Sequence, residues 1–194
     1  MHRNFFLLPV FLFLAFSASA QTLQIGGKVG ANSQRPLAGQ SVESTTNGGS
    51  MGLFAAYQRE QYKMGFRIEL NYQNHWKSLL EEQVEVPLLA EIAIDPKQRL
   101  RLQAGPYLGV GREDEEALKR GGLRFRWGFT TGLEVNIPLS RKWVLVSDAR
   151  VDKSWQAPEN MDPKQQYLVP SKSLRFYLSF GLAYRLQRLK KRRR

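Results

Sequence analysis

The stretch 62–73 reads YKMGFRIELNYQ, and its side chains alternate between two kinds with a period of two residues. The even positions, from Tyr62 through Phe66 to Tyr72, are apolar or aromatic, whereas the odd positions hold charged residues, glycine and amides. Because successive side chains of a strand point to opposite faces, this stretch predicts a strand with one apolar and one ionised face. A sheet built from such strands separates two different environments.

The same alternation recurs along the chain and predicts eight strands. Most of them are close to the ~9 to 11 residues that a tilted strand needs to cross a bilayer. The pattern therefore predicts an all-β fold, an eight-stranded antiparallel up-and-down transmembrane β-barrel over residues 21–186. The expected strands are 22–31, 50–58, 61–73, 83–94, 99–110, 123–137, 142–151 and 173–186.

The expected connections alternate between long and short along the chain. Four are long, at 32–49, 74–82, 111–122 and 152–172, and three are short, at 59–60, 95–98 and 138–141. In an up-and-down barrel the long loops then share one end, and the short turns share the other with both chain ends. Bacterial outer-membrane barrels have long extracellular loops and short periplasmic turns. We therefore expect a multi-pass outer-membrane protein with extracellular long loops and periplasmic termini.

The first twenty residues have the pattern of a cleaved signal peptide. His2 and Arg3 precede an apolar run at 5–16, and the small side chains at 17–20 fit a peptidase site after Ala20. The run is shorter than the ~20 residues of a spanning helix, and no later stretch approaches that length. Helical inner-membrane proteins are thus excluded, and the absence of cysteine excludes disulfides and thiolate metal sites.

The formal net charge of +12 is concentrated at the C-terminus. A strongly basic chain suggests a nucleic-acid partner, but here the excess forms a tail at 187–194 and not a binding face. We expect no nucleic-acid partner and a periplasmic tail, for which anionic headgroups, cell-wall carboxylates and simple solvation remain open. The basic tail residues are Arg188, Lys190, Lys191, Arg192, Arg193 and Arg194.

The charged face is expected to point into the barrel. Glycines share its parity, and residues without a side chain relieve crowding inside a tightly curved wall. This disfavours a soluble, lipocalin-like barrel with an apolar interior. An interior this narrow should be filled by ion pairs, with Glu91 facing Arg101 and a basic excess left for water or anions. The expected network comprises Arg67, Glu69, Glu85, Glu91, Arg101, Arg124, Arg126, Glu134, Asp148, Arg150 and Arg175.

Aromatic residues on the apolar parity predict two girdles at the headgroup level. Tyr57, Tyr62, Trp143 and Tyr184 would lie at the short-turn end, with Tyr72 and Phe176 at the other end.

Catalytic and cofactor signals are weak. His75 has Ser78 within a few residues, but nothing in the sequence orients a nucleophile against a base, so we expect no enzymatic activity. We expect no cofactor and no metal, because the acidic run 113–116 lacks the alternating ligand spacing of a calcium loop. Two functions remain: a structural scaffold with a filled charged lumen, and a narrow transport pore for small solutes or anions.

Several segments resemble a known family. They are IGGKVGAN at 25–32, ELNYQ at 69–73, VPLL at 86–89, AGPYLG at 104–109 and WGFTTGLE at 127–134. Together they are similar to the PorT-type outer-membrane β-barrel family of Bacteroidota, a porin-like family.

The resemblance implies a scaffold or a component of an envelope or secretion assembly, since PorT itself is tied to type IX protein secretion. Residues 181–186 are similar to the signal that the barrel-assembly machinery reads during insertion. The implied partners are outer-membrane lipid, that machinery, and other envelope or secretion proteins contacting loops 32–49 and 152–172.

Overall fold

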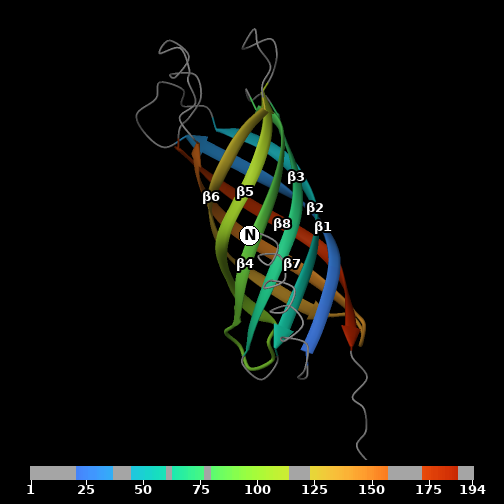
Figure 1. The fold of residues 1–194 in the computed structure, drawn as a ribbon. Helices are drawn as coiled ribbons and strands as arrows, with labels where there is room; N and C mark the ends of the chain where they lie inside the picture. The colour runs from blue at the N-terminus through green and yellow to red at the C-terminus, as the bar shows by residue number, and fades with distance from the viewer. Residues whose placement is uncertain are drawn as a thin grey trace, which may run out of the picture.

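The computed structural model describes residues 21–36, 45–59, 63–76, 80–113, 123–156 and 172–187. Each strand pairs antiparallel with the next, and β8 returns to β1, so the sheet is a closed barrel (Figure 1). The all-β, eight-stranded antiparallel fold predicted from the sequence is thereby confirmed. The strands are β1 (Gln21–Pro36), β2 (Thr46–Arg59), β3 (Met64–Trp76), β4 (Leu80–Ala93), β5 (Leu100–Glu113), β6 (Leu123–Pro138), β7 (Trp143–Gln156) and β8 (Lys172–Gln187).

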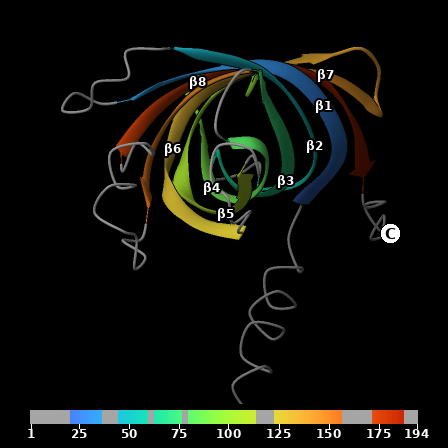
Figure 2. The ribbon, with the colours of Figure 1, turned by 90° about the horizontal axis from the view of Figure 1, so that it is seen from above.

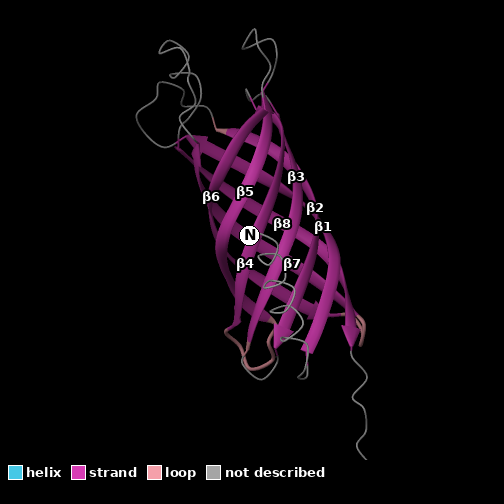
Figure 3. Cartoon of the chain, in the orientation of Figure 1, coloured by secondary structure: helices cyan, strands magenta, loops and turns pink. Residues whose placement is uncertain are grey.

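Closure of the barrel depends on the pairing of the first strand with the last. β1 and β8 are in register from Thr22 opposite Gln187 to Pro36 opposite Ser173. The view along the barrel in Figure 2 shows the strands wrapped around a single interior. Because every strand has two neighbours, the sheet leaves no edge with unpaired backbone groups. In the described residues, no helix has the length and apolar character that crossing a membrane requires (Figure 3).

The two ends of the barrel differ. The turns 94–99 and 139–142 lie at one end, together with the end of β2, the start of β3, the start of β1 and the end of β8 (Figure 1). We call this end the short-turn rim. The other strand ends form the long-loop rim, where 37–45, 77–79, 114–122 and 157–171 connect the strands.

The strands reach further toward the long-loop rim than the sequence predicts. β1 and β2 remain paired out to Gln34 opposite Thr46, beyond the expected ends at 31 and 50. The expectation of a long loop at 74–82 is wrong, because β3 and β4 take up most of it and leave 77–79. The apolar alternation stops before the backbone ladder does, since polar residues can face outward once a strand has left the apolar zone.

The distribution of side chains is inverted relative to that of a soluble protein. The outward positions carry large exposed apolar residues, with 69% of the surface of both Leu108 and Phe125 accessible. The interior is mostly polar, and most of its buried apolar residues form a small cluster around Phe54 and Val144. A lipocalin-like barrel would have the opposite arrangement. Exposed apolar residues occur on every strand, among them Ile25, Leu53, Phe66, Leu88, Leu108, Phe125, Trp143 and Phe180.

Inward-facing glycines make room for the largest interior rings. Gly26 is paired with Phe54, and Gly128 is paired with Tyr107. A Cβ atom at Gly26 would stand 2.6 Å from Phe54 Cζ, and one at Gly128 would stand 2.5 Å from Tyr107 Cζ. Each ring therefore occupies the space that a side chain on the opposite residue would need.

Candidate functional site

The interior ion-pair network is the candidate site, and Arg67 of β3 lies at its centre. Arg67 is 2% exposed, and its Nε atom lies 2.5 Å from Glu91 Oε1. Its Nη1 atom is 3.4 Å from Glu69 Oε1, and its Nη2 atom pairs with Glu134. One guanidinium group thus pairs with carboxylates from three strands. Its central carbon also lies 4.4 Å from the ring centroid of Phe54.

Arg101 extends this network toward the short-turn rim. Its Nη1 atom lies 3.1 Å from Glu91 Oε2, so the structure brings together the two residues that the sequence places across the turn between β4 and β5. Its Nη2 atom donates to Gln58 Oε1 at 2.6 Å. Gln103 connects the same carboxylates, donating to Glu91 at 3.1 Å and to Glu134 at 2.8 Å.

Glu69 organises a second group of charges. Arg150 binds it through two parallel hydrogen bonds, each 2.7 Å long, in the bidentate geometry that arginine favours with carboxylates. Lys28 reaches Glu69 at 2.8 Å and Asp148 at 3.2 Å. Sequence reasoning missed Lys28, although its parity in β1 matches that of the other inward residues.

A third group, centred on Arg175, fills the half of the interior nearer the long-loop rim. Arg175 Nη2 lies 2.5 Å from Glu85 Oε1 and 3.6 Å from Asp152 Oδ2, and it donates to Tyr107 Oη at 2.7 Å. The Tyr177 hydroxyl donates to Gln73 Oε1 at 2.9 Å. Asp152 escaped prediction because the sequence pattern ended its strand at 151, whereas β7 continues to Gln156.

Arg126 differs from the other interior arginines. Its Nη1 atom donates to Gln83 Oε1 at 2.6 Å, and no carboxylate of the described residues lies within 4.0 Å of its guanidinium. The backbone of Arg124 lies opposite Gly111 in the β5–β6 ladder, but its side chain is outside the described part of the structure.

Opposite charges are nearly balanced in the described interior. Five buried arginines and Lys28 face four buried glutamates and two buried aspartates. Arg185 lies opposite the buried Gln24 and adds one more cation with a buried Nε atom. The expected basic excess is therefore present in these residues, but it is smaller than the sequence predicts. The difference has two causes. Three cations that have the parity of the charged face are exposed at the short-turn rim instead, namely Lys63, Arg99 and Lys142, and Asp152 adds a buried carboxylate from a segment expected to be a loop.

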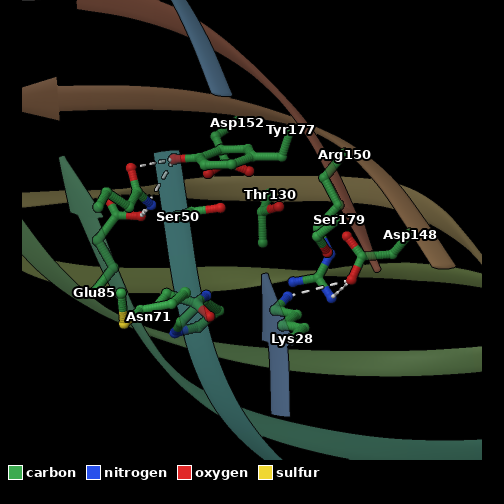
Figure 4. Close-up of a pocket in the computed structure, with 13 residues that line it drawn as sticks. Lys28, Ser50, Asn71, Glu85, Thr130, Asp148, Arg150, Asp152, Tyr177 and Ser179 are labelled. Atoms are coloured by element: carbon green, nitrogen blue, oxygen red, sulfur yellow. Dashed lines mark hydrogen bonds and ion pairs between the residues drawn. The ribbon is translucent and has the colours of Figure 1, made fainter. Parts of the chain in front are cut away.

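A small cavity separates the Glu69 and Arg175 groups. Its volume is about 20 Å³, enough for about one water molecule (Figure 4). Asn71 Oδ1 and Ser179 Oγ line it and have no hydrogen-bond partner among the described residues, and Thr130 lies beside them. These oxygens fit an ordered water, and the space is too small for a hydrated ion. No cluster of three metal-ligating side chains occurs in the described ranges.

The aromatic residues of the expected girdles lie on the outside. Trp143 and Tyr184 meet edge to face at the short-turn rim with ring centroids 5.1 Å apart, and Tyr57 is half-buried near the same rim. Tyr72 and Phe176 face outward in β3 and β8, and Phe176 is 47% exposed.

The structure adds a pair that sequence reasoning missed. Trp127 and Trp155 stack near the long-loop rim with ring centroids 4.9 Å apart. Both residues have the parity of the outward, apolar face, which could have predicted their place on the outside. The sequence analysis, however, placed Trp155 in a loop.

Some expected features fall outside the described residues. They are the signal peptide at 1–20, Tyr62, Ser78, the side chains of the acidic run 113–116 and the tail at 188–194. The side chain of His75 is likewise not described, so its expected lack of a catalytic role stays a prediction.

No protein-family model matches this chain, and no curated protein matches its sequence. Solved structures do resemble it. Neisserial surface protein A has a TM-score of 0.55 at 13% identity, with 84% of this chain and 97% of that chain covered. Ail, the attachment invasion locus protein of Yersinia pestis, has a TM-score of 0.48 at 10% identity, covering 87% and 100%. The outer membrane protein AlkL has 0.47 at 15% identity, covering 90% and 95%.

The chain thus has the fold of eight-stranded outer-membrane barrel proteins. At these identities the likeness shows the fold alone.

Proposed function

We propose that this chain is an integral outer-membrane protein whose charged interior is a closed structural core. The distribution of side chains between the two faces carries the proposal. Large apolar residues cover the outside of every strand, while ionised groups are paired inside. In water, a continuous apolar surface of this extent would drive association, whereas a bilayer accommodates it. A closed barrel also satisfies the backbone polar groups that lipid cannot.

In this proposal the barrel is a scaffold, and the long-loop rim faces the outside of the cell. Loops on rigid barrels commonly carry binding functions, so the connections 37–45 and 157–171, which remain of the expected loops 32–49 and 152–172, are the proposed contact sites for envelope or secretion proteins. The motif resemblance to PorT-type barrels supports a place in such an assembly. Catalysis is not part of the proposed function.

Two single-cysteine variants test the location and the orientation. The chain has no cysteine, so a membrane-impermeant maleimide reports on the introduced thiol alone. Thr45 and Lys97 are both exposed and lie at opposite ends of the barrel. Thr45→Cys should be labelled in intact cells, and Lys97→Cys should be labelled after the outer membrane is permeabilised. Labelling of Lys97→Cys in intact cells would reverse the orientation, and recovery of the protein in the soluble fraction would refute the proposal.

Crosslinking in native outer membranes tests the assembly role. A component of a secretion or envelope assembly should co-purify with a reproducible set of other envelope proteins. Replacement of the segment 157–171 by a short glycine-serine linker should abolish that set while leaving the barrel in the membrane. A barrel that crosslinks to no protein in either form would contradict the assembly role.

A further inference from the structure

Two cations interrupt the apolar outer face near the long-loop rim. Lys153 of β7 and Arg35 of β1 occupy outward positions, and both are exposed. The register places each of them opposite Leu174 of β8, the strand that lies between β7 and β1. With neighbouring strands ~4.8 Å apart, the two Cα atoms are separated by roughly 10 Å. Their long side chains can therefore approach a single group that lies over Leu174.

The stacked tryptophans give this place a fixed geometry. Lys153 Nζ lies 5.6 Å from the ring centroid of Trp155, which in turn stacks on Trp127. Trp155 is the next outward residue of β7 toward the long-loop rim. The ammonium group thus extends from the apolar zone toward the level of the aromatic rings, where it is held by a cation–π contact.

Positive charge in this sector is not compensated on the outer face. No described carboxylate lies within 4.0 Å of Lys153 or Arg35, and the outward positions of β7, β8 and β1 contain no acidic residue. The sector at β4 and β5 differs, because Glu82 occupies an exposed outward position there.

We propose that Lys153, Arg35 and the Trp127–Trp155 pair bind the phosphate of a glycolipid in the outer leaflet. This inference rests on the proposed function, which places lipid against this face and the long-loop rim outside. Guanidinium and ammonium groups both donate to phosphate oxygens, the former in a bidentate fork. The sugar would lie against the tryptophan rings, and the acyl chains would follow Phe129 and the apolar residues below it.

Lipid binding to the protein in phosphatidylcholine nanodiscs tests the inference. Discs containing increasing amounts of diphosphoryl lipid A are titrated, and bound glycolipid is counted by native mass spectrometry. Lys153→Gln and Arg35→Gln should each weaken binding about tenfold, a change of about 1.4 kcal/mol. The double variant should weaken it further. With fully dephosphorylated lipid A, all variants should behave alike.

Lys142→Gln is the matched control, because Lys142 Nζ lies 5.8 Å from the Tyr184 ring at the opposite rim. This variant should bind lipid A as the wild type does. Equal affinity in all variants, or equal loss with Lys142→Gln, would overturn the phosphate site and leave the proposed function standing. Failure of the wild-type chain to enter the discs would overturn both.

Discussion

At the residue scale, the interior arginines are expected to differ in their contributions to stability. Arg67→Leu removes the cation that pairs with Glu134, and it leaves that buried carboxylate with no other cationic partner among the described residues. Glu91 keeps Arg101, and Glu69 keeps Arg150 and Lys28. Loss of one member of a buried pair costs about 3–5 kcal/mol. The urea midpoint of the variant in detergent micelles should fall accordingly. An unchanged midpoint would contradict the network.

Arg126→Leu is the matched comparison. Arg126 donates to the amide oxygen of Gln83, so its loss strands a neutral acceptor and no carboxylate. An unsatisfied buried acceptor costs about 1–3 kcal/mol, and we therefore expect a smaller shift of the urea midpoint than for Arg67→Leu. The sequence alone put both residues in one ionic network. A larger loss in Arg126→Leu than in Arg67→Leu would show that the partners are assigned wrongly.

The paired positions Gly128 and Tyr107 yield a second prediction at this scale. A methyl group at residue 128 would stand 2.5 Å from Tyr107 Cζ, and the ring is fixed by the hydrogen bond that Arg175 donates to its hydroxyl. Gly128→Ala should destabilise the barrel by about 1–3 kcal/mol, as overpacking does. Tyr107→Phe combined with Gly128→Ala should recover little, because the ring remains in the way. Full recovery in that double variant would contradict the steric explanation.

At the scale of the elements, the turn between β4 and β5 is held by the Asp95 carboxylate. Asp95 Oδ1 accepts the N–H of Leu100 at 2.7 Å, and Oδ2 accepts that of Lys97 at 3.1 Å. Desolvation raises the pKa of Asp95, but these backbone hydrogen bonds and one from Arg99 outweigh it and hold the pKa below the ordinary value of 3.8. The ionised carboxylate therefore stabilises the folded turn.

A lowered folded-state pKa fixes the direction of the pH dependence. The stabilisation is complete above the unfolded value near 3.8 and is lost as the pH falls through the lower folded value. Asp95→Asn should therefore lower the urea midpoint at pH 7, and its difference from the wild type should shrink below pH 3.8. A difference that grows on acidification would mean that this carboxylate destabilises the turn.

The sequence predicts the strands well because period-two alternation and short turns are local signals. The stretch 62–73 shows its two faces without any reference to tertiary structure. Strand ends at the long-loop rim are not local in this sense. Asp152 and Lys153 end the apolar pattern of β7, yet the ladder with β8 continues to Trp155 opposite Lys172. Where polar residues are acceptable on both faces, composition no longer distinguishes strand from loop.

At the scale of the whole molecule, parity predicts which residues face inward, but pairing depends on three-dimensional proximity. Glu91 and Arg101 were accessible to sequence reasoning because a short turn joins their strands. Glu69 and Arg150, in contrast, come from β3 and β7 and meet across the barrel. Which side chains meet across a narrow barrel depends on their lengths and on their positions along the barrel axis. No local sequence pattern encodes these positions.

Conduction is the property of the whole barrel that distinguishes a scaffold from a narrow pore. Most interior charges are paired, at distances such as 2.5 Å between Arg175 and Glu85, and the cavity beside them has a volume of only about 20 Å³. An eight-stranded barrel is only wide enough for its own side chains, so ions lack a continuous aqueous path.

Planar-bilayer recordings of the refolded wild-type protein should show no steady unitary currents, with insertion verified by protease protection in matched vesicles. Arg175→Ala combined with Glu85→Ala removes the ion pair of the group nearest the long-loop rim. The ion pairs around Arg67 still fill the rest of the interior, so this variant should also show no unitary currents. Current steps of constant amplitude in the wild type would refute the closed interior and favour a narrow transport pore.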